Sequence, residues 1–244
     1  MLQYHMWKLA FRLMLLVVAF VLYFVNIEML DFTTILQQGF EGIYLWVVWC
    51  TLVVGMLYRI FPNKKIALGA RKHFSCTYKG TPVIQIDVKD KARILKFLNK
   101  GAFLSAFTWL TVSVVIFFVL FQFDKLTPAT ILILALLYSV TDLVFILFFC
   151  PFQVIFMRNH CCAVCRIYNW DYFMMCAPLI LFPSFYAISL FLLSIVVIII
   201  WEVALYKNPH FFTKETNESL RCELCDDKLC KYVLLHNKKP VDKV

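Results

Sequence analysis

The chain has 244 residues, of which 62% are hydrophobic and 16% charged, and its formal net charge is +9. Soluble domains carry about 25% charged residues, so the composition excludes an ordinary soluble globular protein. Runs of about 20 apolar residues indicate an all-α integral membrane protein instead. The basic residues lie between these runs, which favours the lipid bilayer and its anionic headgroups as partners and argues against nucleic acid.

Apolar runs taken in chain order predict about six transmembrane helices, with five as the alternative. The expected spans are residues 13–30, 40–58, 102–123, 129–149, 168–182 and 184–205. In this reading residues 1–206 form one polytopic membrane domain, and residues 207–244 form a cytoplasmic tail. Lys8 and Arg12 precede the first span.

The connections between spans carry local signals of their own. A short basic cytoplasmic segment, residues 62–100, separates spans 2 and 3 and holds ten Lys or Arg against two Asp. Within it, the alternating residues 81–88 (TPVIQIDV) predict a short strand. Gly101 is expected to break the helix that enters span 3. The stretch 124–128 (DKLTP) predicts a tight hairpin between spans 3 and 4.

The number of spans depends on residues 168–206, which Pro178 and Pro183 interrupt. As a helix, residues 168–182 would be only about 22 Å long. With six spans, 23 of the 24 Lys and Arg lie on the cytoplasmic side and only Lys125 lies outside. With five spans, fifteen lie on one side of the membrane and nine on the other. Orientation follows Lys and Arg in short loops, so we expect six spans in a bacterial plasma membrane with both termini cytoplasmic.

Two cysteine clusters flank the last two predicted spans, and six spans place both in the reducing cytosol. Two residues between cysteines allow a tight turn to present both sulfurs to one ion, as in tetrahedral zinc sites. The predicted ligands are Cys162, Cys165, Cys222 and Cys225, and the alternative ligands are Cys161, Cys230 and His160.

The cysteine spacing leaves the chemistry of the clusters open. Zinc is the first expectation, and an iron–sulfur cluster is the second, although the spacing matches neither common ferredoxin pattern. Thiol–disulfide exchange and plain packing or palmitoylation are the remaining alternatives. The cysteines outside the clusters are interpreted as packing residues; they are Cys50, Cys76, Cys150 and Cys176.

Asp142 is the one carboxylate well inside a predicted span, where an ionised group costs at least about 2.5 kcal/mol. We therefore expect it to face the bundle interior, bonded to the hydroxyl of Ser139, Thr141 or Thr111, or to carry a proton in a transport path. Glu202, close to the end of span 6, is expected to snorkel toward the interface.

Two short polar segments predict helix caps. Asn169 or Asp171 is expected to cap the helix of span 5, with Trp170 at the interface. Thr216 or Asn217 is expected to cap a short helix that presents the tail cysteines.

Two pieces of the C-terminal half, RNHCCAVCRIYNWDYFMM and TNESLRCELCDDKLCKY, resemble a set of uncharacterised bacterial multi-pass membrane proteins. Those proteins carry a Cys-rich loop, an NWD-like step and a Cys-x2-Cys-x4-Cys tail. The resemblance implies that the two clusters belong together, and it implies no activity.

The sequence contains no Gly-rich phosphate loop, no His-x-x-x-His pair and no catalytic triad, and it does not decide whether the protein is an enzyme. Two function classes follow. The first is a membrane protein whose cytoplasmic face carries a thiolate metal site with a redox, sensing or partner-docking role. The alternative is a transporter or channel with Asp142 in its path and structural cysteines, or a scaffold subunit of a membrane complex.

Overall fold

The computed structural model describes residues 2–37, 39, 42–61, 73–74, 79, 88–157, 165–213 and 216–221. Over these ranges the chain is helical and forms no strand. The predicted strand 81–88 lies outside the described residues except for Val88, which begins a helix.

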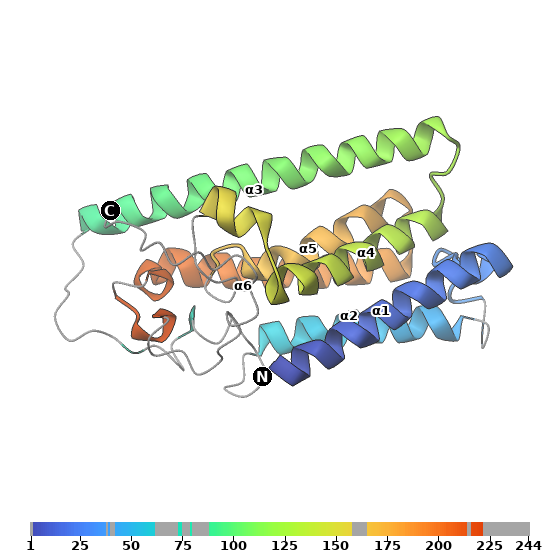
Figure 1. Cartoon of the computed structure of the whole chain (residues 1–244), viewed down its shortest axis with the longest axis horizontal. Helices are drawn as coiled ribbons and strands as arrows, with labels where there is room; N and C mark the ends of the chain where they lie inside the picture. The colour runs from blue at the N-terminus through green and yellow to red at the C-terminus, as the bar shows by residue number, and fades with distance from the viewer. Residues whose placement is uncertain are drawn as a thin grey trace.

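Five long helices dominate the structure (Figure 1). They are α1 (Leu2–Val25), α2 (Ile43–Ile60), α3 (Val88–Gln122), α4 (Pro128–Leu147) and α6 (Phe185–Lys207). Each is long and apolar enough to cross a membrane. Their length and composition are those of a membrane protein.

Shorter helical turns connect the long helices. They are η1 (Ile27–Leu30), η3 (Gln153–Met157, a π-helical turn), η5 (Tyr168–Trp170), α5 (Asp171–Cys176), η6 (Ala177–Leu181), η7 (Pro209–Phe212) and η8 (Glu218–Leu220). The side chain of Asn217 caps η8 by accepting a hydrogen bond from the Ser219 backbone N–H, which confirms that predicted cap.

The predicted hairpin between α3 and α4 is confirmed and has a clear local cause. Asp124 adopts a left-handed backbone with φ of 52°, which reverses the chain directly after α3. Thr127 then caps α4 in a reciprocal capping box with Thr130, and Pro128 occupies the first turn. Proline is favoured there because its missing N–H would have no helical partner.

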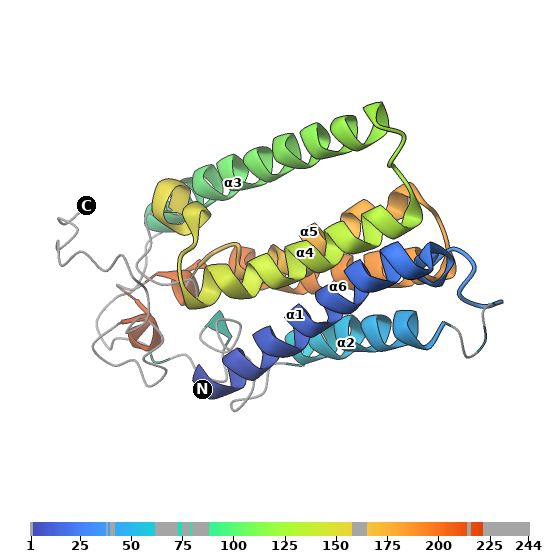
Figure 2. The same cartoon turned by 45° about the vertical axis from the view of Figure 1, so that its right-hand side comes forward.

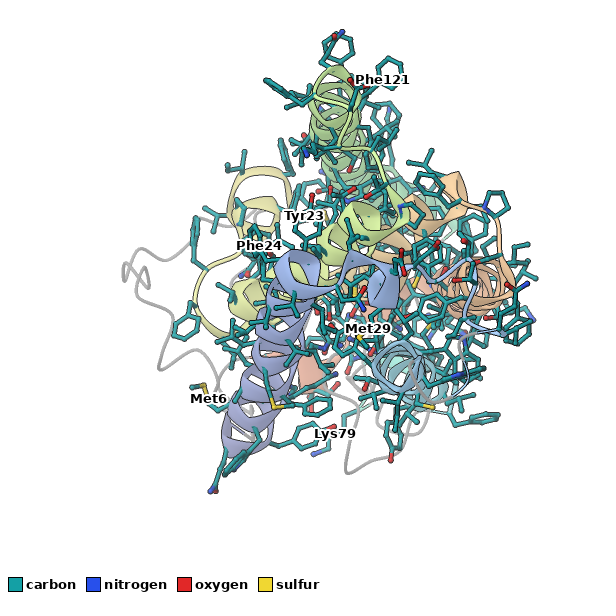
Figure 3. The ribbon with its side chains drawn as sticks, turned by 90° about the vertical axis from the view of Figure 1, so that its right-hand side faces the viewer. Met6, Tyr23, Phe24, Met29, Lys79 and Phe121 are labelled. Atoms are coloured by element: carbon teal, nitrogen blue, oxygen red, sulfur yellow. The ribbon has the colours of Figure 1, made fainter. Side chains whose placement is uncertain are left out.

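Helices α1, α2, α4 and α6 pack into one bundle with α5 between α4 and α6 (Figures 1 and 2). Helix α3 stands away from this bundle and contacts it mainly through η3 and η7, near one end. Figure 3, a view along the bundle, shows α3 apart from the other helices, with Phe121 among its outward-pointing side chains. The surface of α3 is therefore largely apolar and exposed, as Phe103, Phe107 and Phe118 illustrate.

The predicted fifth span is a succession of short turns rather than one helix. Residues 168–181 form η5, α5 and η6, and Pro178 lies in the first turn of η6. The chain runs along α6 in the opposite direction: the Arg166 carbonyl accepts from Trp201 near the end of α6, and the Phe173 ring lies 5.7 Å from that of Phe191. Proline cannot donate a helical hydrogen bond, so a single regular helix does not form.

Two apolar clusters make up the core. The larger fills the bundle, with Leu45, Ile131 and Tyr186 fully buried. The smaller surrounds Trp201 at the end where α4 and α6 finish, and it joins Met157 to Phe212. The second cluster connects the bundle to the chain that follows α6.

Gly101 does not break the helix as predicted, because α3 continues through it from Val88 to Gln122. Its role is close packing instead. A Cβ atom at this position would lie 2.7 Å from the Met157 Sδ and 2.9 Å from the Phe156 carbonyl oxygen. Gly101 thus lets α3 approach η3, one of the few contacts that hold α3 to the bundle.

Gly101→Ala should lower the thermal midpoint of the purified protein in detergent, because the added methyl group collides with a backbone carbonyl. Overpacking of this kind costs about 1–3 kcal/mol, which exceeds the gain in helix propensity of up to about 1 kcal/mol. Val114→Ile on the exposed side of α3 adds one methylene and should leave the midpoint unchanged. A higher midpoint for Gly101→Ala would contradict the packing role.

Candidate functional site

Three arginines are buried at the end of the bundle where α2, α4 and α6 finish. Arg12, Arg59 and Arg166 expose only 2%, 7% and 3% of their surface. All three contact or belong to residues 166–172, which we call the RIYNWDY segment. A buried guanidinium needs partners for its charge and its donors, so these contacts fix the segment in place.

Arg59, in the last turn of α2, holds the middle of the RIYNWDY segment. Its Nη1 donates to Asn169 Oδ1 at 2.6 Å, and its Nη2 donates to Asp171 Oδ2 at 2.8 Å. The guanidinium carbon lies 4.0 Å from the centre of the Tyr168 ring, within cation–π range. Both charge and hydrogen-bonding capacity are therefore matched in a buried setting.

This arrangement overturns the predicted cap of α5. The N-cap residue is Trp170, and no side chain caps the helix. Asn169 and Asp171 accept hydrogen bonds from Arg59 instead. A buried guanidinium offers a charge-assisted bond, which is roughly twice as strong as a neutral one.

Arg12 joins α1 to α4 and supplies the opposite charge for Asp142. Its Nη1 donates to the Ser139 carbonyl at 2.8 Å and lies 3.8 Å from Asp142 Oδ2. Its Nη2 lies 3.4 Å from the Tyr172 hydroxyl. The predicted hydroxyl partners are wrong: no hydroxyl bonds Asp142 within the described ranges, and Thr111 donates to Phe107 in its own helix.

Arg166 attaches the start of the segment to α6. Its Nη1 and Nη2 donate to the two carboxylate oxygens of Glu202 at 2.6 and 2.5 Å. The Trp170 indole N–H donates to the same carboxylate at 2.9 Å, and the Trp201 N–H donates to the Arg166 carbonyl at 2.7 Å. Glu202 is thus held in a bidentate pair and does not extend freely to the interface as predicted.

Tyr172 packs closely against α2 at Gly55. A Cβ atom on Gly55 would collide with the Tyr172 hydroxyl, which also faces Arg12. The glycine in α2 therefore makes room for a ring that is fully buried between α1 and α2.

A cavity of about 120 Å³ lies beside the charged residues. That is roughly ten times the volume one water molecule requires on the same measure. Asp142 and Asp171 are its carboxylates, and the rest of its lining is mainly apolar and aromatic. The other lining residues are Trp109, Tyr138, Thr141, Phe145, Ile146, Cys150, Phe152, Cys165, Ile167, Tyr168, Met174 and Met175.

Of the predicted metal ligands, the structure describes Cys165, which is 4% exposed and packs in the cluster around Trp201. The others lie outside the described residues: His160, Cys161, Cys162, Cys222, Cys225 and Cys230. Within the described ranges, no group of three or more His, Cys, Asp or Glu is arranged to hold a metal ion.

Sequence reasoning identified Asp142 but missed the arginines that balance the carboxylates. Arg12 and Arg59 each lie one residue outside a predicted span, so hydropathy alone gives neither a place inside the bundle. The helices in fact contain them, since α1 begins at Leu2 and α2 ends at Ile60. One sequence signal could have indicated these ion pairs: an arginine next to an apolar run, in a chain that also has a carboxylate inside a predicted span.

Comparison of the chain with known protein families, with curated proteins and with solved structures gave no match. The resemblance of the two cysteine-bearing pieces therefore stays a prediction.

The Arg59–Asp171 pair can be tested by a double-mutant cycle on the free energy of unfolding in detergent. Arg59→Met and Asp171→Asn should each destabilise the protein by about 3–5 kcal/mol, because each leaves a buried charge without its partner. The double variant should be more stable than the sum of the two losses predicts, by up to about 3 kcal/mol.

Arg93→Met is the matched control, because Arg93 is exposed on α3. It should change the free energy of unfolding by no more than about 0.5 kcal/mol. Additive losses in the Arg59 and Asp171 variants would show that the two side chains are not energetically coupled.

Proposed function

We propose that the protein crosses the bilayer six times, with both termini cytoplasmic, and carries a thiolate metal site on its cytoplasmic face. Zinc is the first choice and an iron–sulfur cluster the second. The site would be built from the loop that ends at Cys165 and from the tail that begins after Arg221. Its role would be redox transfer, sensing or the docking of a protein partner.

The observation that carries the proposal is the common anchorage of the two cysteine-bearing segments. Cys165 and Phe212 belong to the same buried cluster around Trp201. The Trp201 N–H donates to Arg166, the residue after Cys165, and its ring lies 5.0 Å from that of Phe212. One side chain of α6 therefore contacts both the end of the loop and the start of the tail.

Hydrogen bonds continue this anchorage to the residue before Cys222. The Asn217 side-chain amide donates to the Phe211 carbonyl at 2.8 Å, and Thr216 donates to the His210 carbonyl. The Glu218 N–H donates to the carbonyl of Lys79, labelled in Figure 3, at 3.0 Å. These bonds anchor residues 211–218 next to the cluster that contains Cys165, and this supports a site shared between loop and tail.

Six crossings also agree with the path of residues 168–181. Their 3₁₀ turns rise about 2.0 Å per residue, so η5, α5 and η6 together reach about 25 Å, whereas a regular helix of the same residues would reach about 21 Å. Local thinning of the bilayer accommodates the remaining difference. The segment then returns the chain to the outer side before α6, and the tail stays with the basic residues inside.

A transporter or channel is the second candidate function, because Asp142 lines a cavity beside Asp171. In that case the cysteines would only hold the cytoplasmic face together. The ion pairs of Arg12 and Arg59 favour a structural role for both carboxylates, so we place transport second.

Purified protein should contain near-stoichiometric metal, colourless if zinc and brown if iron–sulfur. Cys162→Ser and Cys222→Ser should each lose the ion and lower the thermal midpoint similarly. A structural ion binds only the assembled site, so its affinity of about 10 kcal/mol or more is added to the folding stability. Elemental analysis, absorption spectra and thermal unfolding supply the measurements.

The double variant should be little less stable than either single one, because both changes remove the same site. Cys50→Ala, at an exposed position on α2, is the control and should keep the metal. Metal-free wild-type protein, together with an unchanged midpoint in the double variant, would refute the shared site.

Topology can be tested in sealed right-side-out cells stripped of metal, with a membrane-impermeant thiol reagent. Cys222 and Cys225 should not react, because six crossings place the tail inside. Lys125→Cys in the α3–α4 hairpin provides the positive control and should react from outside. Labelling of the native tail from outside would leave five crossings and separate the two clusters.

A further inference from the structure

Both carboxylates of the cavity have cationic partners before any ligand enters. Its two carboxylates, Asp142 and Asp171, face the guanidinium groups of Arg12 and Arg59, neither of which lines the cavity. Lys8, one turn before Arg12, is half-buried and interacts electrostatically with both carboxylates. A bound cation would therefore add charge that these residues do not offset.

Two buried polar atoms on residues that line the cavity nevertheless lack partners. The Asp171 side chain is 5% exposed, and its Oδ1 accepts no hydrogen bond while its Oδ2 bonds Arg59. The buried Trp109 indole N–H has no acceptor. An unsatisfied buried donor or acceptor costs about 1–3 kcal/mol, so a ligand able to bond both would recover that energy.

We propose that this cavity binds a neutral lipophilic hydroxyl compound, of which a phenol is the simplest form, taken up from the bilayer. A hydroxyl group can donate to a carboxylate of Asp171 or Asp142 and accept from Trp109. It adds no charge to a site whose carboxylates already have cationic partners. The aromatic walls formed by Tyr138, Phe145 and Phe152 suit a ring in offset or edge-to-face contact.

The position of α3 favours entry from the lipid. This helix contributes only Trp109 to the lining and lies against α4 mainly through side chains. The Ser113 and Tyr138 hydroxyls bond at 2.9 Å one turn beyond Trp109, and Gly101 packs on η3 at the other end. Phe145, Ile146 and Phe152 are among the apolar side chains that line the cavity.

The proposal does not depend on the metal site. It can be tested with protein in lipid nanodiscs and three probes: 4-octylphenol, its methyl ether 4-octylanisole, and the amine 4-octylbenzylamine. The phenol should raise the thermal midpoint in a saturable manner. The ether, which cannot donate, should bind about tenfold more weakly, the equivalent of one lost hydrogen bond of about 1.4 kcal/mol. The amine should also bind more weakly than the phenol.

Trp109→Phe removes the unpaired N–H together with the five-membered ring that carries it, so it should weaken phenol binding at least about tenfold relative to the variant's own probe-free midpoint. Asp142→Asn should weaken it severalfold, because a charge-assisted bond becomes a neutral one. Trp7→Phe, which is 71% exposed, is the control and should bind as the wild type does.

Several results would overturn the proposal. Equal affinities for the phenol and the ether would mean that apolar contact alone accounts for binding and that the hydroxyl group donates no hydrogen bond in the cavity. Tighter binding of the amine would make the cavity a cation site, as a transporter would use. Unsaturable phenol binding, or binding unaffected in both Trp109→Phe and Asp142→Asn, would place the phenol elsewhere.

Discussion

The structure depends on burying charge in pairs at one end of an otherwise apolar bundle. Arg59 is the clearest case, since it donates one short hydrogen bond each to Asn169 and Asp171 and lies over the Tyr168 ring. Removing one member of such a pair leaves an isolated charge where water is scarce, which costs far more than the pair itself contributes. The pairs therefore specify which helix faces lie together, because an alternative packing would leave an arginine unpaired.

The RIYNWDY segment is where these pairs converge. Arg166 bonds α6 through Glu202, the middle of the segment bonds α2 through Arg59, and Tyr172 reaches Arg12 of α1. A regular transmembrane helix would direct most of these side chains to lipid or apolar neighbours. Residues 168–181 form short irregular turns instead of one continuous helix. In this conformation Arg166, Asn169 and Asp171 form hydrogen bonds to α2 and α6. The cavity borders this segment, so these buried polar contacts lie next to an unfilled space lined by Asp142 and Asp171.

The same end of the bundle connects the membrane helices to the cysteine-bearing segments. Trp201 is the link, because it contacts Arg166, Phe212 and the buried cluster that includes Cys165. Packed side chains therefore join the chain after α6 to Arg166, which in turn bonds Glu202.

The sequence by itself determined the class of protein, five of the six predicted apolar spans as long helices, and the α3–α4 hairpin, because these follow from hydropathy and local turn chemistry. It also singled out Asp142 and the cap at Asn217. Only the tertiary structure decided that Arg12 and Arg59 lie inside their helices, that Asn169 and Asp171 bond an arginine rather than cap a helix, and that Gly101 serves packing. Each of these depends on a partner at least 50 residues away in the chain, and local patterns carry no information about such partners.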